Sequence, residues 1–447
     1  MRWRGRVHSL AALAGTAAGA AIATPHLAGA ALLAAVALGV VGSLAPALSL
    51  ALYAAGNAVL CAGFQIGAVR VAPETIFLGW ILFFALARTL ADPGASAAAW
   101  RRVRAPAAAA IAFSAVATFS ALRAGVDREA VEILSHAPVW IANAVSLPLL
   151  AAGRHRLRLV CAALVVTSAA LGLLTLAIPS ALESLRGGAF LSEYRNPYAH
   201  FLSLGLLLSI SFALLGPPPF RLPAHLATLL LAAAMIETGS RAAWFSAAAG
   251  GAVLLLSRAG RLAPRGSGVA AALLLVGGTA VALHAEPVRR GAERAAERFA
   301  TIFDWSRRSS NRYRLEIAEV SLRMAREDPI LGSGPGRFRE SAESKRAGLR
   351  SLSKGVHATD NEYARTLGET GLLGLLLLLG FGAASAKRLR RTLRDAKDAR
   401  DAWAPAAGAA LLAFLAVLAA FEDLAYAGTF WFLLGAVHAC SLPEEEP

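Results

Sequence analysis

The sequence predicts an all-α protein, a polytopic transmembrane helix bundle with about 12–14 spans. Of its 447 residues, 57% are hydrophobic and only 16% are charged. The apolar residues come in blocks of about 20, and a helix of that length crosses the ~30 Å of hydrocarbon in a bilayer. Because lipid offers the backbone no hydrogen-bond partners, helices are the expected spanning element. The alternating segments of about 10 residues that form a transmembrane barrel are missing from the sequence.

Candidate spans divide the chain into three regions. Residues 1–284 hold the first eleven spans, residues 285–361 form a long polar loop, and residues 362–447 hold the last spans and a C-terminal tail. The first span follows a short basic N-terminus and is expected to be an uncleaved helix. The candidate spans are 7–23, 27–43, 48–66, 74–90, 106–123, 137–152, 159–178, 198–215, 223–239, 242–257, 268–284, 362–386, 404–420 and 426–440.

Short basic connections predict the orientation of these spans. Residues 100–104, 153–158, 257–265 and 387–400 are rich in arginine, and such loops favour the cytoplasmic side. With fourteen spans, all four connections fall on one side, together with both termini. The loop 285–361 then lies on the opposite side, which is the periplasm if the protein is in the inner membrane of a cell. Its own positive charge is no objection, since loops longer than about 60 residues escape the rule.

The net charge and the cysteines argue against two classes of function. The net charge of +15 is concentrated in loops that set topology, so no nucleic-acid partner is expected. Cys61, Cys161 and Cys440 are isolated inside or beside apolar runs and show neither metal-ligand spacing nor a disulfide pattern. We expect all three to be packing residues.

The polar loop is expected to fold as a small amphipathic lid on the outer membrane face. Apolar residues recur at helical spacing over residues 287–303 and again over residues 312–326. Asn311 is expected to cap the second helix, and Asp328, which precedes a proline, to end it. Glycines then predict a tight turn over residues 332–336. The predicted apolar face of the second helix consists of Leu315, Ala318, Leu322 and Ala325.

Three arginines on the predicted outer side are candidates for binding an anion. Arg241 lies between two spans, where its guanidinium can hold a phosphate with two hydrogen bonds while its stem crosses apolar surface. The alternative is an interfacial anchor without a ligand. Arg312 and Arg314 open the second loop helix, and positive charge there adds to the anion preference of a helix N-terminus. The alternative for these two is a solvated basic face.

His357 is the loop's only histidine and the candidate general base. The alternative is an ordinary surface histidine. Asn361 lies one helical turn later, where it can position His357 or a sugar hydroxyl, or simply cap the span that begins near Glu362. Asp360 and Glu362 could together hold a divalent cation. We expect no metal and no cofactor, because the arginines of this loop can neutralise a pyrophosphate.

Four motifs follow one another along the chain: Asn196–Leu202; Thr238–Trp244; Arg314–Ile317 with Met324 and residues 329–336; and His357 through Asn361 and Tyr363 to Glu369–Gly374. In this order they resemble the O-antigen ligase/polymerase family of membrane glycosyltransferases of the GT-C type. Two departures are visible: Ala318 stands where the family often has tryptophan, and Thr359 replaces the second histidine of its His-x-His-Asn segment, with Asp360 inserted before Asn361.

The resemblance implies transfer of a glycan from undecaprenyl pyrophosphate to an acceptor hydroxyl, with inversion and without metal. The acceptor is the lipid A core in ligases, a growing glycan chain in polymerases, and a protein hydroxyl in some relatives. In this interpretation Arg241, Arg314 and Arg312 bind the donor pyrophosphate, His357 is the catalytic base, and Asn361 and Asn196 support them. The alternative is a transporter or flippase of a lipid-linked polysaccharide, which would be expected to carry more ionisable residues inside its spans.

Overall fold

The computed structural model describes a helical membrane protein over most of its C-terminal three quarters. The described residues are 50–51, 53–54, 64–66, 69–71, 78–79, 82, 93–151, 153–177, 195–256, 310–338, 340, 361–422, 424 and 428–442. Within them the prediction of a polytopic helix bundle is confirmed. The predicted spans 7–23, 27–43 and 268–284 and the predicted loop helix 287–303 lie outside the described residues.

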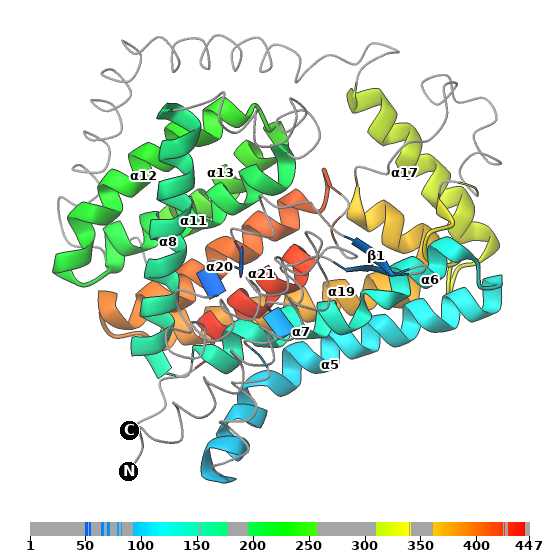
Figure 1. The fold of residues 1–447 in the computed structure, drawn as a ribbon, viewed down its shortest axis with the longest axis horizontal. Coiled ribbons are helices and arrows are strands. Elements are labelled where there is room, and N and C mark those ends of the chain that lie inside the picture. The colour runs from blue at the N-terminus through cyan, green and yellow to red at the C-terminus, as the bar shows by residue number, and fades with distance from the viewer. Residues whose placement is uncertain are drawn as a thin grey trace, which may run out of the picture.

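Apolar helices make up the bundle, and two polar helices lie at one end of it (Figure 1). Among the described residues, seven helical stretches are long and apolar enough to cross a membrane, and α13 and α21 are shorter apolar helices. The two polar helices are α6 (Arg128–Ser135) and α17 (Ser310–Glu327). The apolar helices are α5 (Pro93–Ala124), α7 (Ala137–Leu150), α8 (Gly153–Ala177), α11 (Arg195–Leu215), α12 (Pro218–Thr238), α13 (Arg241–Leu256), α19 (Glu362–Asp395), α20 (Ala399–Leu418) and α21 (Gly428–Cys440).

One short hairpin departs from the expected helices. Strands β1 (Phe64–Ile66) and β2 (Val69–Val71) pair antiparallel, with Phe64 opposite Val71 and Ile66 opposite Val69. The predicted span 48–66 is therefore wrong at its C-terminal end. β-Branched and aromatic residues on both sides of a two-residue connection favour a hairpin over the last turn of a helix.

Helices α11 and α20 form the centre of the bundle. The apolar window of α11 is 89% buried and that of α20 is 67% buried, whereas α12 and α19 are 28% buried. Glycine lets the helices around this centre approach closely: a Cβ at Gly250 of α13 would lie 2.8 Å from the carbonyl oxygen of Ala410. Small residues at helix crossings allow such close packing in membranes.

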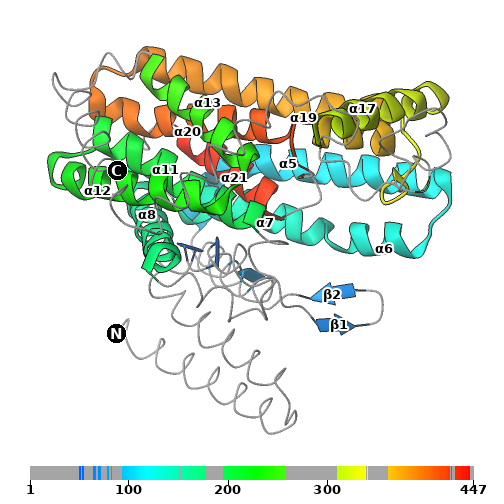
Figure 2. The same ribbon diagram turned by 90° about the horizontal axis from the view of Figure 1, so that it is seen from above.

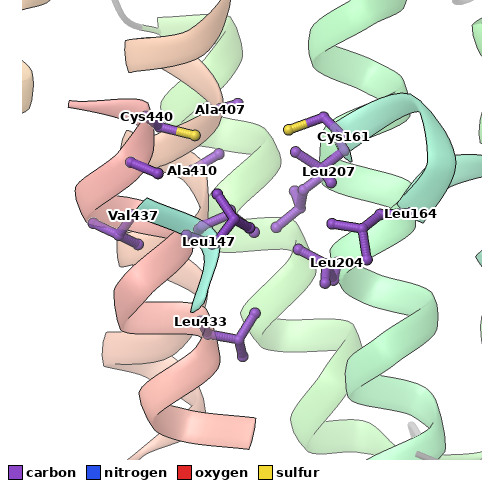
Figure 3. Packing of buried hydrophobic residues seen from close by; sticks show 14 of the residues in the cluster. Leu147, Cys161, Leu164, Leu204, Leu207, Ala407, Ala410, Leu433, Val437 and Cys440 are labelled. Atoms are coloured by element: carbon purple, nitrogen blue, oxygen red, sulfur yellow. The ribbon is translucent and has the colours of Figure 1, made fainter. Parts of the chain in front are cut away.

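The main apolar core joins α7, α8, α11, α20 and α21. Figure 3 shows Cys161 of α8 and Cys440 of α21 among leucines and alanines of this core, with Leu207 of α11 between these helices. Both cysteines are free and buried, as expected for packing residues. Cys61 lies outside the described residues.

Basic connections gather at one end of the bundle. His438 Nε2 lies 3.0 Å from the carbonyl oxygen of Arg102, and Arg154 forms an ion pair with Asp401 at 2.5 Å. A Cβ at Gly408, in the middle of α20, would touch both Leu389 and Cys440, so the C-terminal parts of α19 and α21 pack against α20 here. Three of the four basic segments named above therefore share an end. Their prediction as connections is wrong in part, because residues 100–104 lie inside α5, residues 153–158 begin α8 and residues 387–395 end α19. We call this end of the bundle the basic end and the opposite one the outer end.

Candidate functional site

A turn after α20 collects candidate residues from three other helices at the outer end. Helix α20 ends at Leu418, and Phe421 N donates a hydrogen bond to Leu418 O at 2.9 Å, which tightens the chain into a turn. Phe421 and Glu422 are half-buried at its tip, before α21 begins at Gly428. We call this pair the α20–α21 turn.

Arg314 packs on the aromatic residue of this turn. Its guanidinium carbon lies 5.5 Å from the centroid of the Phe421 ring, which is within the range of a cation–π contact. The other partner of Phe421 is Phe245 of α13, whose ring is stacked on it at 6.1 Å with an interplanar angle of 20°. A stack of Arg314, Phe421 and Phe245 therefore joins α17, the α20–α21 turn and α13.

Arg241 is the first residue of α13, one helical turn before Phe245. The preceding connection is tightly defined: Gly239 ends α12 with a positive φ of 65°, and Ser240 Oγ accepts a hydrogen bond from Ala243 N at 3.4 Å. Ser240 is buried and Arg241 is half-buried. The helix that begins with Arg241 and the helix that carries Arg314 thus meet through the Phe245–Phe421 contact.

Asn196 reaches the same turn from α11. Its Nδ2 donates a hydrogen bond to Glu422 Oε1 at 2.7 Å. Of the candidates predicted from the sequence, Arg314 and Asn196 therefore contact the α20–α21 turn directly. Arg241 lies one helical turn before Phe245, which stacks on Phe421 of that turn.

Arg312 and Asn361 make local contacts in the structure. Arg312 Nε forms an ion pair with Glu316 Oε1 at 2.9 Å on its own helix, and the Arg312 side chain is 51% exposed. Asn361 caps α19, since its Oδ1 accepts a hydrogen bond from Ala364 N at 3.0 Å. This capping was one of the two roles expected for Asn361. His357 lies outside the described residues, as does Asp360.

Glu362 ties the start of α19 to the same region. It is buried, its Oε1 accepts a hydrogen bond from Thr366 Oγ1 at 2.6 Å, and its Oε2 accepts one from Leu424 N. The backbone N–H of Glu362 donates to Ala419 O at 2.7 Å. Glu362 therefore fixes where α19 begins relative to the α20–α21 turn.

Helix α17 packs on α19 through a face different from the predicted one. Ile317, Val320 and Met324 are buried with Phe338 and Ala364, whereas Leu315 and Leu322 are 53% and 54% exposed. The predicted apolar face of Leu315, Ala318, Leu322 and Ala325 is therefore not the face that packs on α19. The residues that fill the space against Ala364 and Phe338 are Ile317, Val320 and Met324, each two positions further along the helix. The helix also begins at Ser310, so Asn311 lies in its first turn and is not its cap.

The segment after α17 supplies hydrogen-bond partners where α19 is interrupted at Gly371. Gly371 has φ 66° and ψ −165°, which interrupts the helix and leaves the carbonyls before it and the amides after it without their helical partners. Residues 329–334 supply those partners: Ser333 N and Gly334 N donate to the carbonyls of Gly368 and Glu369. In return, Leu372 N and Leu373 N donate to the carbonyls of Pro329 and Ile330.

The buried carboxylate of Glu369 accepts hydrogen bonds from the backbone of the glycine-rich turn. It is fully buried; its Oε1 accepts hydrogen bonds from Gly336 N and Phe338 N, both at 3.2 Å, and its Oε2 faces Arg365 Nε at 3.3 Å. A buried carboxylate is tolerated when donors and an opposite charge surround it. The predicted tight turn at residues 332–336 is therefore confirmed, and it is anchored to a transmembrane helix.

Arg337 connects the segment to α6 and the end of α5. Its Nε donates to Asp127 Oδ2 at 3.0 Å, and its Nη2 donates to Gly125 O at 2.5 Å. Asp127 is also the cap of α6. The hydrogen bond from Ala130 N, followed by the contact with Arg337, lowers the pKa of Asp127 below its ordinary value of 3.8. Figures 1 and 2 both show α17 and α6 at the end where α5 and α19 come together.

Sequence reasoning missed the residues that organise this site. Phe421, Glu422 and Phe245 carry no motif, and they meet only because α11, α13 and α20 pack together. One signal was available for Glu422, because it is an acidic residue in a short connection on the predicted outer side. The roles of Glu369 and Gly371 were also missed, although both lie inside a quoted motif.

The arrangement can bind an extended anionic ligand beside apolar surface. Arginine guanidinium groups match the geometry of phosphate oxygens, and an aromatic stack limits the directions that Arg314 can take. Among the described residues, no group of three or more His, Cys, Asp or Glu side chains is placed to hold a metal ion. The described candidates thus supply positive charge and hydrogen-bond donors.

Comparison with known proteins gives one family match, over the middle of the chain. The family model described as O-Antigen ligase matches residues 226–379, which run from α12 into α19 and include Arg241, Arg314 and His357. Asn196 and the α20–α21 turn lie outside the matched residues. No curated protein matches the chain. The match covers three of the four motifs and confirms the family resemblance of that region; the Asn196–Leu202 motif lies outside it. Together with the apolar helices, the match indicates a multi-pass membrane protein with a general role in glycan transfer.

Proposed function

We propose that this chain, whose residues 226–379 match the O-antigen ligase family, is a glycosyltransferase. It transfers a glycan from undecaprenyl pyrophosphate to an acceptor hydroxyl at the outer end of the bundle, which faces the periplasm in an inner membrane. The acceptor is a lipid A core, a growing glycan chain or a protein. The observation that carries the proposal is the convergence of Arg314, Asn196 and the helix of Arg241 on the α20–α21 turn.

The chemistry requires stabilisation of a leaving group whose negative charge grows. The acceptor oxygen attacks the anomeric carbon, the bond to the pyrophosphate oxygen breaks with its electron pair, and inversion follows from attack on the opposite face. Fixed guanidinium groups at the position where this charge develops stabilise the transition state more than the ground state. We assign this role to Arg241 and Arg314, with Arg312 as a further donor at the start of α17.

The acceptor proton needs a base, and His357 is the candidate. Imidazole is the usual general base near neutral pH and can accept the proton as the new bond forms. Asn361 begins α19 four residues later, and its side chain is used to cap that helix. We keep Asn361 as a supporting residue, because its cap fixes where α19 begins, four residues after His357.

Purified full-length protein in lipid nanodiscs, supplied with a polyprenyl-pyrophosphate glycan and a panel of acceptors, tests the proposal. Arg241→Ala, Arg314→Ala and His357→Ala are expected to keep normal insertion and to lose transfer by about 100-fold or more. Arg323→Ala is the matched control, because Arg323 lies on α17 with Arg314 but pairs with Glu319 on the exposed face.

Two results would overturn the proposal. Wild-type transfer by Arg241→Ala and Arg314→Ala would remove the arginines from the mechanism. Movement of the lipid-linked glycan across the bilayer of proteoliposomes, without formation of any product, would assign the chain to the transporter alternative.

A further inference from the structure

A second feature lies on the side of the bundle where α13, α19 and α20 meet, and it extends along α20 from Ala409 to Ala416. A groove of about 560 Å³ runs between these helices. Its walls are nearly all apolar: Val253 comes from α13, Leu389 and Leu393 from α19, and Leu412 and Ala413 from α20. Its volume lies in the range of ~300–1,000 Å³ that is typical of ligand pockets. The residues proposed for glycan transfer do not contribute to it.

Two arginines line this groove at the basic end. Arg390 and Arg394 are four residues apart on α19, so they lie on the same face of the helix, next to the apolar wall. Both are exposed. Arg394 Nε has Asp395 Oδ1 at 3.3 Å, but both side chains of that pair are about 70% exposed (74% and 68%), and such exposed pairs are weak. The guanidinium groups are therefore accessible to a ligand in the groove.

The lining has the polarity of a single lipid molecule. Apolar walls within the membrane-spanning length suit acyl chains, and two cations where the helix leaves the membrane suit a phosphate group. Basic pockets between transmembrane helices on the cytoplasmic side are a recurring form of anionic lipid site. The end concerned is the one that the basic connections predict to be cytoplasmic.

We propose that this groove binds one anionic phospholipid, with its acyl chains between α13, α19 and α20 and its phosphate on Arg390 and Arg394. The proposal does not depend on glycan transfer, because the site lies at the opposite end of α19. Its occupancy stabilises the packing of α19 on α20.

Native mass spectrometry of the full-length protein with added phosphatidylglycerol or with phosphatidylcholine of the same acyl chains tests the charge requirement. Phosphatidylglycerol is expected to bind about tenfold or more tightly than phosphatidylcholine, since each arginine near a lipid phosphate contributes to the affinity. Arg390→Gln with Arg394→Gln is expected to abolish this preference. Lys387→Gln with Arg391→Gln is the matched control, because it removes the same charge from the same end of α19 without touching the groove.

A second pair of variants tests the apolar part. Ala413→Phe fills the groove and is expected to lower binding of phosphatidylglycerol about tenfold or more. Ala383→Phe, at an exposed position of α19 outside the groove, is expected to leave it unchanged. Thermal unfolding with and without phosphatidylglycerol reports folding of each variant independently of transfer activity.

Each remaining outcome overturns the proposal. Equal binding of phosphatidylglycerol and phosphatidylcholine would show that the groove is an apolar surface without preference for an anionic headgroup. If the variant with Arg390→Gln and Arg394→Gln still preferred phosphatidylglycerol, residues other than these two arginines would bind the lipid phosphate. Loss of a dimer in Ala413→Phe, without loss of lipid, would assign the groove to a second copy of the chain. Full competition by inorganic phosphate alone would make the site an ion site.

Discussion

Asn196 Nδ2 donates a hydrogen bond to Glu422 Oε1 at 2.7 Å, and this contact ties the start of α11 to the α20–α21 turn. The neighbouring residue in that turn, Phe421, stacks on Phe245 and carries the cation–π contact with Arg314. The position of the Arg314 guanidinium therefore depends on a hydrogen bond that Arg314 itself does not make.

This dependence predicts that Asn196 and Glu422 act together. Asn196→Ala and Glu422→Ala are each expected to reduce transfer, because either change removes the hydrogen bond that holds the turn carrying Phe421. The double variant is expected to be little worse than the worse single variant, with a coupling free energy of about 0.5–3 kcal/mol. Rates of transfer for the four proteins of this cycle give the coupling. Strictly additive effects would show that the two residues work independently.

Because α19 is interrupted at Gly371, adding one methyl group there is expected to destabilise the protein strongly. Gly371→Ala places a Cβ 2.4 Å from the carbonyl of Ile330 at a residue with φ 66°, so both the backbone conformation and the close contact are lost. Destabilisation by about 1–3 kcal/mol or more is expected. The measurement is thermal unfolding of the protein in detergent.

Gly380→Ala provides the matched control on the same helix. A Cβ at Gly380 meets nothing within 4 Å, and alanine favours a helix over glycine. Stability equal to or slightly above that of the wild type is expected. Equal melting temperatures for both variants would contradict the assignment of Gly371 to a required break.

The contact between Asp127 and Arg337 predicts a dependence on pH. The pKa of Asp127 is lowered in the folded protein, first by the hydrogen bond from Ala130 N and then by Arg337. A carboxyl group with a depressed folded pKa stabilises the protein fully above its ordinary value of 3.8, and this contribution is lost as the pH falls through the lower folded value. Asp127→Asn keeps a good helix cap but removes the charge.

The difference in melting temperature between wild type and Asp127→Asn is therefore expected to be largest near neutral pH and to shrink below about pH 4. Measuring both proteins over the same pH series removes the general effect of acid. A difference that grows as the pH falls would contradict the direction of the pKa shift.

We expect that removal of metal ions does not reduce the rate of glycan transfer. In the proposed mechanism the arginines, and not a cation, meet the pyrophosphate, and both carboxylate oxygens of Glu362 already accept hydrogen bonds from Thr366 and Leu424. Transfer in the presence of EDTA is expected to equal transfer without it. If EDTA abolished the reaction and a divalent ion restored it, Asp360 and Glu362 would become the candidates for a metal site.

The orientation of the bundle predicts opposite results for two topology reporters. A reporter inserted near Ser344 is expected to read as outside the cytoplasm, and one near Arg394 as cytoplasmic, because they belong to the loop 285–361 and to the basic end. Paired alkaline phosphatase and fluorescent protein fusions measure this. The reverse result would invert the orientation and remove a periplasmic site.

The sequence was most informative where a signal is local. Hydropathy predicted the apolar helices of the described region, and Asn361 and the glycines at 332–336 predicted a cap and a turn that the structure contains. The residues of α17 that pack on α19 were not predicted, because Leu315 and Ile317 satisfy helical spacing equally well. Only the position of Ala364 and Phe338 decides between the two faces.

The candidate site could be predicted in part. Arg314 and Asn196 belong to quoted motifs, and both contact the α20–α21 turn. That turn itself, with Phe421 and Glu422, is defined by contacts between helices that are distant in sequence, and such contacts leave no periodic trace. The assignment of His357 as the base stays a prediction, since it lies outside the described residues.

The exchange of hydrogen bonds at Gly371 has a mechanical consequence. Four hydrogen bonds through residues 329–334 bridge the two halves of α19, so a change of direction at Gly371 also moves the chain that leads from α17. A displacement of α17 would therefore be transmitted along α19 from the outer end to the basic end.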